Sequence, residues 1–320
     1  MKAAIINENG PASVLACADR PDPALSDGAV HVRLRAISLE GGDLLNRRIT
    51  PPRSFPHIIG YQGAGLVEAV GRGVTKVHVG QRVVAFNWSG SHAEIFAVPE
   101  HFVYPIPDDL SFELASTIPV AFGTAHDSLF EFGRLRAGET VLIQGAAGGV
   151  GIAALQLAKA AGATVIGTSS TDERLERLSQ FGLDHGINYR TQDIAKTTRA
   201  LTKGAGADLV VDLAGGQNIK ALLGAVAYRG RVSMVGASSG DLPTLEFFDL
   251  IRKSLTVFGI SFGQEMHTPR AHVLLANLID QLASGRLKMP IDRRFPLAEA
   301  GDAHAYAEQG HPFGRVLIIP

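Results

Sequence analysis

Small residues follow an apolar run in the middle of the chain at a spacing that suits anion binding. After the run at Val141–Gln144, the residues Ala146, Gly148 and Gly151 occupy the three positions of an A-x-G-x-x-G pattern. Such a pattern provides a tight turn after a strand, close approach of the backbone to a phosphate, and close packing of the next helix. The amides expected to face the pyrophosphate of a dinucleotide belong to Gly149, Val150 and Gly151.

The segments around this pattern have the spacing of a βαβ unit. A helical pattern covers residues 152–163, and an apolar run at 163–170 leads into another helix, for which Thr171 is the expected N-cap. Further strand-like runs lie at 187–189, 207–215, 230–236 and 255–260. Six strands separated by helices or loops predict a doubly wound parallel sheet, which favours a dinucleotide site over a merely structural turn with chance glycines.

The residues that end the second predicted strand indicate which dinucleotide is preferred. An NAD-binding protein places Asp or Glu there to accept hydrogen bonds from the ribose hydroxyls, whereas this chain has Thr168, Ser169 and Ser170. No acid at these positions repels a 2′-phosphate, and Arg174 can donate charge-assisted hydrogen bonds to one. We therefore expect NADPH as the cofactor. The alternative for Arg174 is a helix-surface charge paired with a nearby acid.

Composition restricts the class of protein. The chain has 320 residues, enough for two domains, and its 30 basic and 31 acidic residues show no bias toward nucleic acid or membrane partners. Cys17 is the single cysteine, which excludes an internal disulfide and makes a reducing cytoplasm the default expectation. The polar N-terminal sequence shows no secretory signal.

The two ends of the chain differ in pattern from its middle. Short alternating runs at 30–38, 63–71 and 81–86, separated by Gly, Pro and Asp, predict a compact β-rich domain. An amphipathic helix is expected at 272–287 and a closing strand at 314–320. We therefore expect a catalytic domain made of residues 1–122 and 262–320, with the dinucleotide-binding domain, residues 123–261, inserted between its two parts.

The order of these segments resembles the medium-chain dehydrogenase/reductase superfamily, and within it the zinc-independent, zeta-crystallin-like quinone oxidoreductase group. The segments that carry the likeness are 55–83, 106–129, 141–151, 186–190 and 313–320. The resemblance implies an α/β fold in which a GroES-like β-barrel catalytic domain joins a Rossmann domain, with the active site between them. It also implies that Ser170, Arg174 and Tyr189 contact the 2′-phosphate, and Gly236 is assigned to the cofactor site as well.

Zinc-dependent members of the superfamily carry a C-x-x-D segment and a His-Glu pair just after a glycine. The matching segments here read Glu40-Gly41-Gly42-Asp43 and Gly60-Tyr61-Gln62, so only Glu40 suits a zinc ion. A four-cysteine zinc lobe is impossible with one cysteine. Three histidines without ligand spacing are expected to be surface or hydrogen-bonded residues: His57, His92 and His126. We therefore expect no metal.

Without a Lewis acid, the acceptor must already be electrophilic. Quinones and α,β-unsaturated carbonyls qualify, because hydride addition places negative charge on an oxygen that needs only hydrogen-bond donors. Tyr61 is one candidate donor, or else packs; by resemblance Thr124 lies beside the nicotinamide. Glu40 is a candidate proton donor if burial raises its pKa, with a salt bridge to Arg47 or Arg48 as the alternative.

Two other functions stay open. The group commonly has Asn and Tyr at the positions of Glu40 and Leu45, so their replacement is also compatible with an NADPH-binding structural protein of little turnover. An enoyl-thioester reductase would need a basic patch, for which Arg47, Arg48 and Arg53 are candidates. The substrate pocket is expected to depend on the loops at 87–91 and 261–268. The apolar sixth strand predicts a homodimer, because an uncovered strand edge invites pairing.

Overall fold

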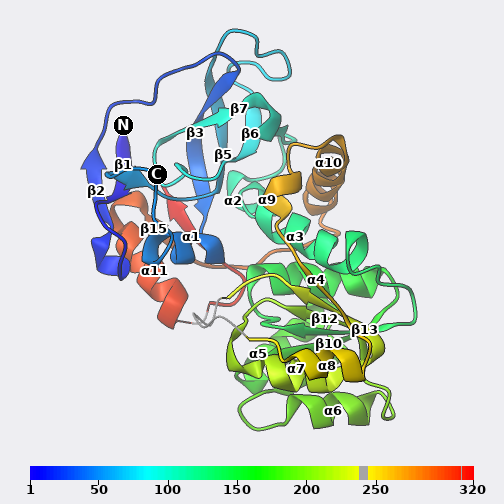
Figure 1. The fold of residues 1–320 in the computed structure, drawn as a ribbon. Helices are drawn as coiled ribbons and strands as arrows, with labels where there is room; N and C mark the ends of the chain where they lie inside the picture. The colour runs from blue at the N-terminus through cyan, green and yellow to red at the C-terminus, as the bar shows by residue number, and fades with distance from the viewer. Residues whose placement is uncertain (238–243, 311) are drawn as a thin grey trace. The chain divides into compact units, whose positions relative to one another are not determined.

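The computed structural model describes residues 1–237, 244–310 and 312–320, which form two compact units (Figure 1). Unit 1 comprises Met1–Gly123 and Gly263–Pro320, and unit 2 comprises Thr124–Phe262. Unit 2 is therefore inserted, in sequence, between two parts of unit 1.

Unit 2 is built on a six-stranded parallel sheet of order β11-β10-β9-β12-β13-β14. Its strands are β9 (Thr140–Gln144), β10 (Thr164–Ser169), β11 (His185–Asn188), β12 (Ala207–Asp212), β13 (Val226–Met234) and β14 (Thr256–Gly259). The order reverses between β9 and β12, and ligands of such sheets bind where this reversal occurs, outside the carboxyl ends of the strands. The predicted doubly wound sheet is confirmed.

Helices cover both faces of this sheet, with α4 on one face and α6, α7 and α8 on the other (Figure 1). The helices are α3 (Gly123–His126), which begins at the unit boundary, α4 (Gly149–Ala160), α5 (Asp172–Leu178), α6 (Ile194–Leu201), α7 (Ile219–Ala225) and α8 (Phe247–Arg252). Leu142, Ile166 and Val210 lie at the centre of three adjacent strands and are fully buried with Leu222 of α7. Burial on both faces explains why these strands are continuous apolar runs.

Two helix starts can be compared with the sequence patterns. The helix expected at 152–163 spans Gly149–Ala160, because its first turn consists of glycines that hydrophobic periodicity does not mark. Thr171 is the N-cap of α5, as predicted, and its hydroxyl accepts a hydrogen bond from the amide of Arg174 at 3.4 Å. This cap fixes the start of the helix that follows β10.

Unit 1 is β-rich, as its alternating runs predicted. A sheet of order β15-β16-β3-β5-β6-β8, with β7 also paired to β3, holds most of its strands, and a second sheet has the order β2-β1-β4. The strands are β1 (Lys2–Ile6), β2 (Ala16–Asp19), β3 (Ala29–Ser38), β4 (His57–Ile58), β5 (Gln62–Val70), β6 (Arg82–Phe86), β7 (Ile95–Pro99), β8 (Val103–Pro105), β15 (Ile291–Pro296) and β16 (Arg315–Ile319). Both segments of unit 1 thus contribute to one sheet.

The helices of unit 1 connect and cover these strands. They are α1 (Gly41–Arg48), α2 (Phe112–Ala115), α9 (Phe262–Glu265), which begins at the unit boundary, α10 (Pro269–Ala283) and α11 (Ala300–Gln309). The core joins Val32 and Leu34 of β3 to Phe96 of β7 and Ile318 of β16, all buried. Over the described ranges, no helix has the length and apolar character needed to cross a membrane.

Candidate functional site

The turn after β9 begins at a glycine that directly precedes the A-x-G-x-x-G pattern. The left-handed conformation is adopted by Gly145, at φ 76°, rather than by Ala146, which is fully buried. The amide of Ala146 donates to the carbonyl oxygen of Thr168 at 3.2 Å and so joins the turn to β10. Ala146 lies within this turn, as the pattern requires, and the residue with the left-handed conformation is its neighbour Gly145. Only glycine adopts this conformation without strain, which places the requirement one position earlier.

The close packing predicted at Gly151 is present. A Cβ atom there would lie 2.5 Å from the carbonyl oxygen of Gly145 and 2.6 Å from that of Ala146, so any side chain would push α4 off the turn. Gly148 is the N-cap, and no side chain caps the helix. The amides of Gly149, Val150 and Gly151 therefore stay available to an anion at the carboxyl edge of the sheet.

The residues expected around a second phosphate lie at the neighbouring strand end. Ser169 is the last residue of β10 and Ser170 follows it, and both are buried. The amide of Tyr189 donates to the carbonyl oxygen of Ser169 at 3.1 Å. Arg174 follows in the first turn of α5. Gly236 lies two residues beyond β13, where a Cβ atom would be 3.0 Å from the carbonyl oxygen of Leu213. The set combines hydroxyls, amides and a guanidinium, which suits a phosphate-bearing ligand.

Sequence reasoning missed a buried polar pair at the point where strand order reverses. Gln144 ends β9 and donates from Nε2 to Asp212 Oδ1, at the end of β12, at 3.1 Å. The same oxygen accepts from the amides of Ala214 and Gly215 at 3.0 and 2.8 Å, which shapes the loop after β12. Burial raises the pKa of Asp212. The sequence does contain a signal for this pair, because Gln144 and Asp212 are the polar residues that end two otherwise apolar runs.

Glu40 lies at the start of α1 and is buried in an ion pair with Arg315 of β16. Its Oε1 also accepts from Ser38 Oγ at 3.0 Å and from Gln62 Nε2 at 2.6 Å. Burial raises the pKa of the Glu40 carboxyl, while Arg315 and these hydrogen bonds oppose the rise. The expected salt-bridge partners Arg47 and Arg48 are wrong: the partner comes from the far end of the chain.

Arg47 does not belong to a surface patch, because its side chain is completely buried. It pairs with Glu308 at 2.5 Å, and its Nη1 lies 3.2 Å from Nδ1 of His304. The basic patch expected from Arg47, Arg48 and Arg53 therefore loses its first member. A buried guanidinium is tolerated here because Glu308 compensates its charge.

His92 is hydrogen-bonded, as predicted, and lies in the same buried network. Its Nε2 is 3.0 Å from Nε2 of His304. Arg47 can only donate, so Nδ1 of His304 accepts, and the proton of His304 sits on Nε2 and points to His92. Burial lowers the pKa of His92 to about 3 and, with His92 and Arg47, lowers that of His304 well below its usual value. Both imidazoles are therefore neutral.

Tyr61 precedes β5 and packs on α1. A Cβ atom at Gly42 would lie 2.3 Å from the tyrosine ring, so the glycine makes room for it. The hydroxyl oxygen accepts from Asn46 Nδ2 at 2.9 Å, and the described residues offer no acceptor for the hydroxyl proton. Burial, together with the charge of Asp43, raises the pKa of Tyr61 to about 12. The side chain is thus a neutral hydrogen-bond donor with a free proton.

Thr124 belongs to unit 2, whereas Tyr61 and Glu40 belong to unit 1. It is buried in α3, and its carbonyl oxygen accepts from Ser128 Oγ at 2.7 Å. Within unit 1, Tyr61 and Glu40 thus lie close together around α1. All the proposed cofactor-binding residues, from Ala146 to Gly236, belong to unit 2.

The residues at the zinc positions do not fit a zinc ion. The carboxylate of Glu40 is engaged by Arg315, Ser38 and Gln62. Gln62 is occupied on both sides, because its Oε1 accepts from the amide of Val120 at 2.9 Å. Within the ranges that the structure describes, no three His, Cys, Asp or Glu side chains lie together as a metal site would require.

Family models match both units. The alcohol dehydrogenase GroES-like domain matches residues 26–108, and the zinc-binding dehydrogenase family matches residues 149–277. A GroES-like domain combined in one chain with a doubly wound sheet of the dinucleotide-binding type is typical of two-domain dehydrogenases and reductases.

Comparison with individual proteins narrows the family assignment. It is 34% identical over 295 residues to a quinone oxidoreductase of Pseudomonas aeruginosa, covering 91% of each chain. It is 32% identical to the zebrafish synaptic vesicle membrane protein VAT-1 homolog, with 92% of this chain spanning 65% of that protein. The crystal structure of the Escherichia coli quinone oxidoreductase complexed with NADPH superposes with a TM-score of 0.96 at 28% identity and complete coverage of both chains. The chain belongs to the medium-chain dehydrogenase/reductase superfamily, in its quinone oxidoreductase group.

Proposed function

We propose that this protein is an NADPH-dependent oxidoreductase that transfers hydride, without zinc, to a quinone or an α,β-unsaturated carbonyl. The observation that carries the proposal is the carboxyl edge of the unit 2 sheet. There the uncapped amides of Gly149–Gly151 face the point of strand reversal, and Ser169 and Ser170 stand where an acid would select NADH. The NADPH in the Escherichia coli relative supports this choice.

The chain's own residues would hold the two phosphate ends of this cofactor separately. The amides of Gly149, Val150 and Gly151, with the positive end of the α4 dipole, would bind the pyrophosphate. Ser170, Arg174 and Tyr189 would bind the 2′-phosphate, with Arg174 providing the charge-assisted bonds. When bound, the nicotinamide supplies a hydride, so that quinone, NADPH and one proton give hydroquinone and NADP⁺.

Tyr61 would stabilise the acceptor as charge develops on its oxygen. Its hydroxyl keeps its proton because burial raises its pKa to about 12, and Asn46 orients the group by donating to its oxygen. A fixed donor of this kind stabilises an oxyanion without itself losing a proton. Thr124 is the second proposed donor. Glu40 was the candidate proton donor. Because it is ion-paired with Arg315, we propose instead that it holds Arg315 and Gln62 in place.

The proposed acceptors are those that need no Lewis acid. The donor set at Glu40, Tyr61 and Gln62 does not suit zinc, so an alcohol is a poor substrate for this site. The 2-haloacrylate reductase that resembles this chain, with a TM-score of 0.86 at 30% identity, is named for an electrophilic alkene. The burial of Arg47 removes one charge from the surface patch that an enoyl-thioester carrier would need.

The test is a panel of acceptors with the purified protein. Quinones and enones should oxidise NADPH, followed at 340 nm, and dialysis against a strong chelator should leave the rate unchanged. Reduction of NADP⁺ by secondary alcohols, or loss of activity with stoichiometric zinc, would contradict the proposal. NADPH binding without turnover of any acceptor would instead favour the structural-protein alternative.

We also propose that the protein forms a homodimer through β14. This strand pairs only with β13 and ends the sheet, so over the described residues its outer edge has no partner strand. An apolar edge of this kind is usually covered. Light scattering at micromolar concentration should give twice the chain mass of 33.8 kDa, and a monomer would contradict this proposal.

A further inference from the structure

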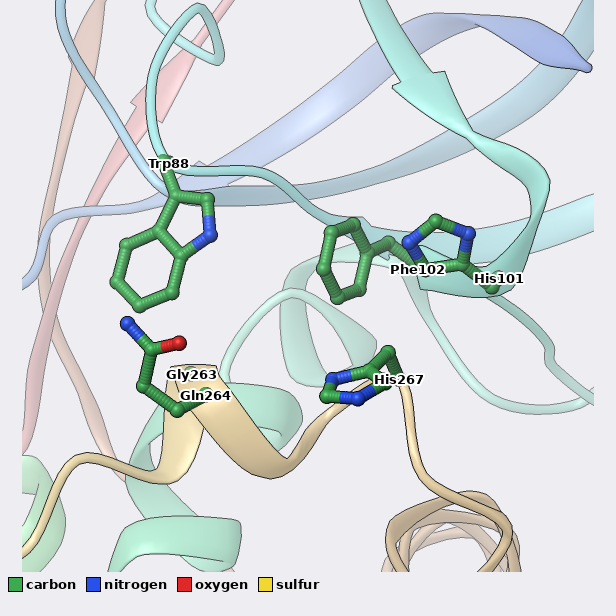
Figure 2. A pocket seen from close by; sticks show the side chains of 6 residues that line it. All are labelled: Trp88, His101, Phe102, Gly263, Gln264 and His267. Carbon is green, nitrogen blue, oxygen red and sulfur yellow. The ribbon is translucent and has the colours of Figure 1, made fainter.

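A pocket of about 490 Å³ lies wholly within unit 1, at the two loops from which pocket shape was expected (Figure 2). It is lined by Trp88, His101, Phe102, Gly263, Gln264 and His267. Trp88 and Gln264 face Phe102, His101 and His267 across the pocket (Figure 2). Its volume is in the range typical of small-molecule sites.

The aromatic wall of the pocket is continuous with the proposed hydrogen-bond donor Tyr61. The rings of Tyr61 and Trp88 meet edge to face with centroids 6.4 Å apart, and Phe86 lies 5.3 Å from Trp88 and 5.4 Å from Phe102. The indole is 43% exposed, whereas Phe102 is buried at the base. A half-exposed ring held by aromatic neighbours offers its surface to another flat ring.

The backbone opposite the indole is shaped to receive it. A Cβ atom at Gly263 would lie 2.6 Å from Cη2 of Trp88 and 3.0 Å from Cζ of Phe86. The lack of a side chain at Gly263 therefore lets the indole lie against α9, and any larger residue would push Trp88 into the pocket.

Two hydrogen bonds join the segment that carries His101 and Phe102 to the segment that carries His267. Tyr104 donates to the carbonyl oxygen of Met266 at 2.7 Å, and Nε2 of His272 lies 2.9 Å from the carbonyl oxygen of His101. The segments that carry Phe102 and His267 are thereby held at a set separation. The pocket is preformed, so a ligand would not need to order its loops.

The polar groups that line the pocket are two imidazoles, those of His101 and His267, and the amide of Gln264. Burial, followed by the nearby charges of His267, Lys76 and His272, lowers the pKa of His101, so its imidazole is neutral at pH 7. None of the six described lining residues is an Asp, Glu, Lys or Arg. Imidazole and amide N–H groups beside an aromatic wall suit the carbonyl oxygens of a flat ring system, and the described lining offers no Lys or Arg to pair with a phosphate or carboxylate.

We propose that this pocket binds the ring system of a fused aromatic quinone, stacked against Trp88, with His101, His267 and Gln264 as the donors available to its carbonyl oxygens. The inference rests on the proposed function, because it selects fused quinones from the acceptors considered there. In this proposal, Trp88 and its neighbours make the protein prefer aromatic quinones to small aliphatic enones.

Trp88 is the only tryptophan of the chain, so binding can be followed without turnover. Titration of the cofactor-free protein with 1,4-naphthoquinone should quench tryptophan fluorescence with saturation, after correction for inner-filter absorption. Free N-acetyltryptophanamide, quenched only by collision, gives the linear baseline. Cyclohex-2-enone should give no saturable quenching over the same concentrations.

Kinetics then test the selectivity. Trp88→Ala should raise the ratio of the naphthoquinone KM to the cyclohexenone KM about tenfold, the loss expected for a stacked ring. Trp88→Phe should restore most of the difference. His101→Ala should raise the same ratio by a few-fold, and His78→Ala, which removes an exposed imidazole of the same unit, should leave it unchanged.

The outcomes separate this inference from the proposed function. Saturable quenching without NADPH oxidation by any acceptor would support the pocket and refute the function. NADPH oxidation with only linear quenching, and with an unchanged KM ratio in Trp88→Ala and His101→Ala, would refute the pocket and leave the function standing. If Trp88→Ala fails to fold, His101→Ala and Gln264→Ala decide by the same ratio.

Discussion

The buried pair His92 and His304 makes the stability of unit 1 depend on pH in a direction that can be worked out. A histidine is half protonated near pH 6.5 in an unfolded chain, whereas burial lowers the pKa of His92 to about 3 in the folded state. The unfolded state therefore binds more protons below pH 6.5, and stability falls as pH decreases from 6.5 toward the folded pKa. Above pH 6.5 the term fades within about one pH unit, as the unfolded histidine also becomes neutral.

The magnitude follows from the pH interval alone. Each pH unit within this window costs about 1.4 kcal/mol per buried histidine, so between pH 6.5 and 5.0 His92 contributes a loss of about 2 kcal/mol. The folded pKa does not enter as long as it stays below about 4. Because His92 is completely buried, no screening by solvent reduces this figure.

His92→Gln removes the titration and keeps a side chain that can accept from His304. Between pH 6.5 and 5.0, wild type should lose about 2 kcal/mol more of its unfolding free energy than the variant, although the variant is less stable throughout. Urea unfolding at a series of pH values, followed by the fluorescence of Trp88 in the same unit, measures this difference.

His78→Gln provides the matched control, because it makes the same substitution at an exposed histidine of the same unit. Burial is the main cause of the lowered pKa of His304, so His304 is expected to stay neutral in this pH range when His92 is replaced. If His92→Gln and wild type lose stability in parallel over this range, then His92 is not neutral and buried as described, and the reasoning fails.

Three substitutions test the proposed site residues. Arg174→Ala should raise the KM for NADPH about tenfold and leave NADH nearly unaffected in steady-state kinetics; equal effects on both cofactors would contradict its assignment to the 2′-phosphate. Tyr61→Phe should lower kcat about a hundredfold while the Kd for NADPH, measured by fluorescence titration, stays constant. A normal kcat would remove Tyr61 from the mechanism. Glu40→Gln should destabilise the protein by roughly 3 to 5 kcal/mol in urea unfolding, because it leaves Arg315 buried without a countercharge, whereas Glu68→Gln in an exposed pair should cost less than about 1 kcal/mol. Equal costs would show that the buried pair is solvated.

The doubly wound sheet could be predicted because its signals are local. Strands buried on both faces must be apolar along their whole length, and the turn after β9 must be built from small residues, so runs such as 141–144 and 207–212 stand out in the sequence. The limits expected for the inserted domain, residues 123 and 261, differ by one residue from those of unit 2. At these limits the hydrophobic pattern changes, from short alternating strands to helices and continuous apolar strands.

Local signals located some features only approximately. The sequence marked a tight turn and a helix start, but which residue of the turn adopts the left-handed conformation, here Gly145, depends on backbone geometry that adjacent small residues do not reveal. Ser169, Ser170 and Arg174 could be assigned together because they follow one strand directly in sequence.

The partners of the charged and polar groups were decided by the tertiary structure alone. For Glu40, the alternative to a proton-donor role was a salt bridge to an arginine a few residues away. Its partner Arg315 instead comes from the closing strand, because β16 lies beside β3 in the sheet. Arg47 and Glu308 are 261 residues apart, and His92 and His304 are 212 apart. Hydrophobic periodicity states which face of an element is buried, but a buried charge takes whichever opposite charge the fold brings within reach. No local pattern of residues records that choice.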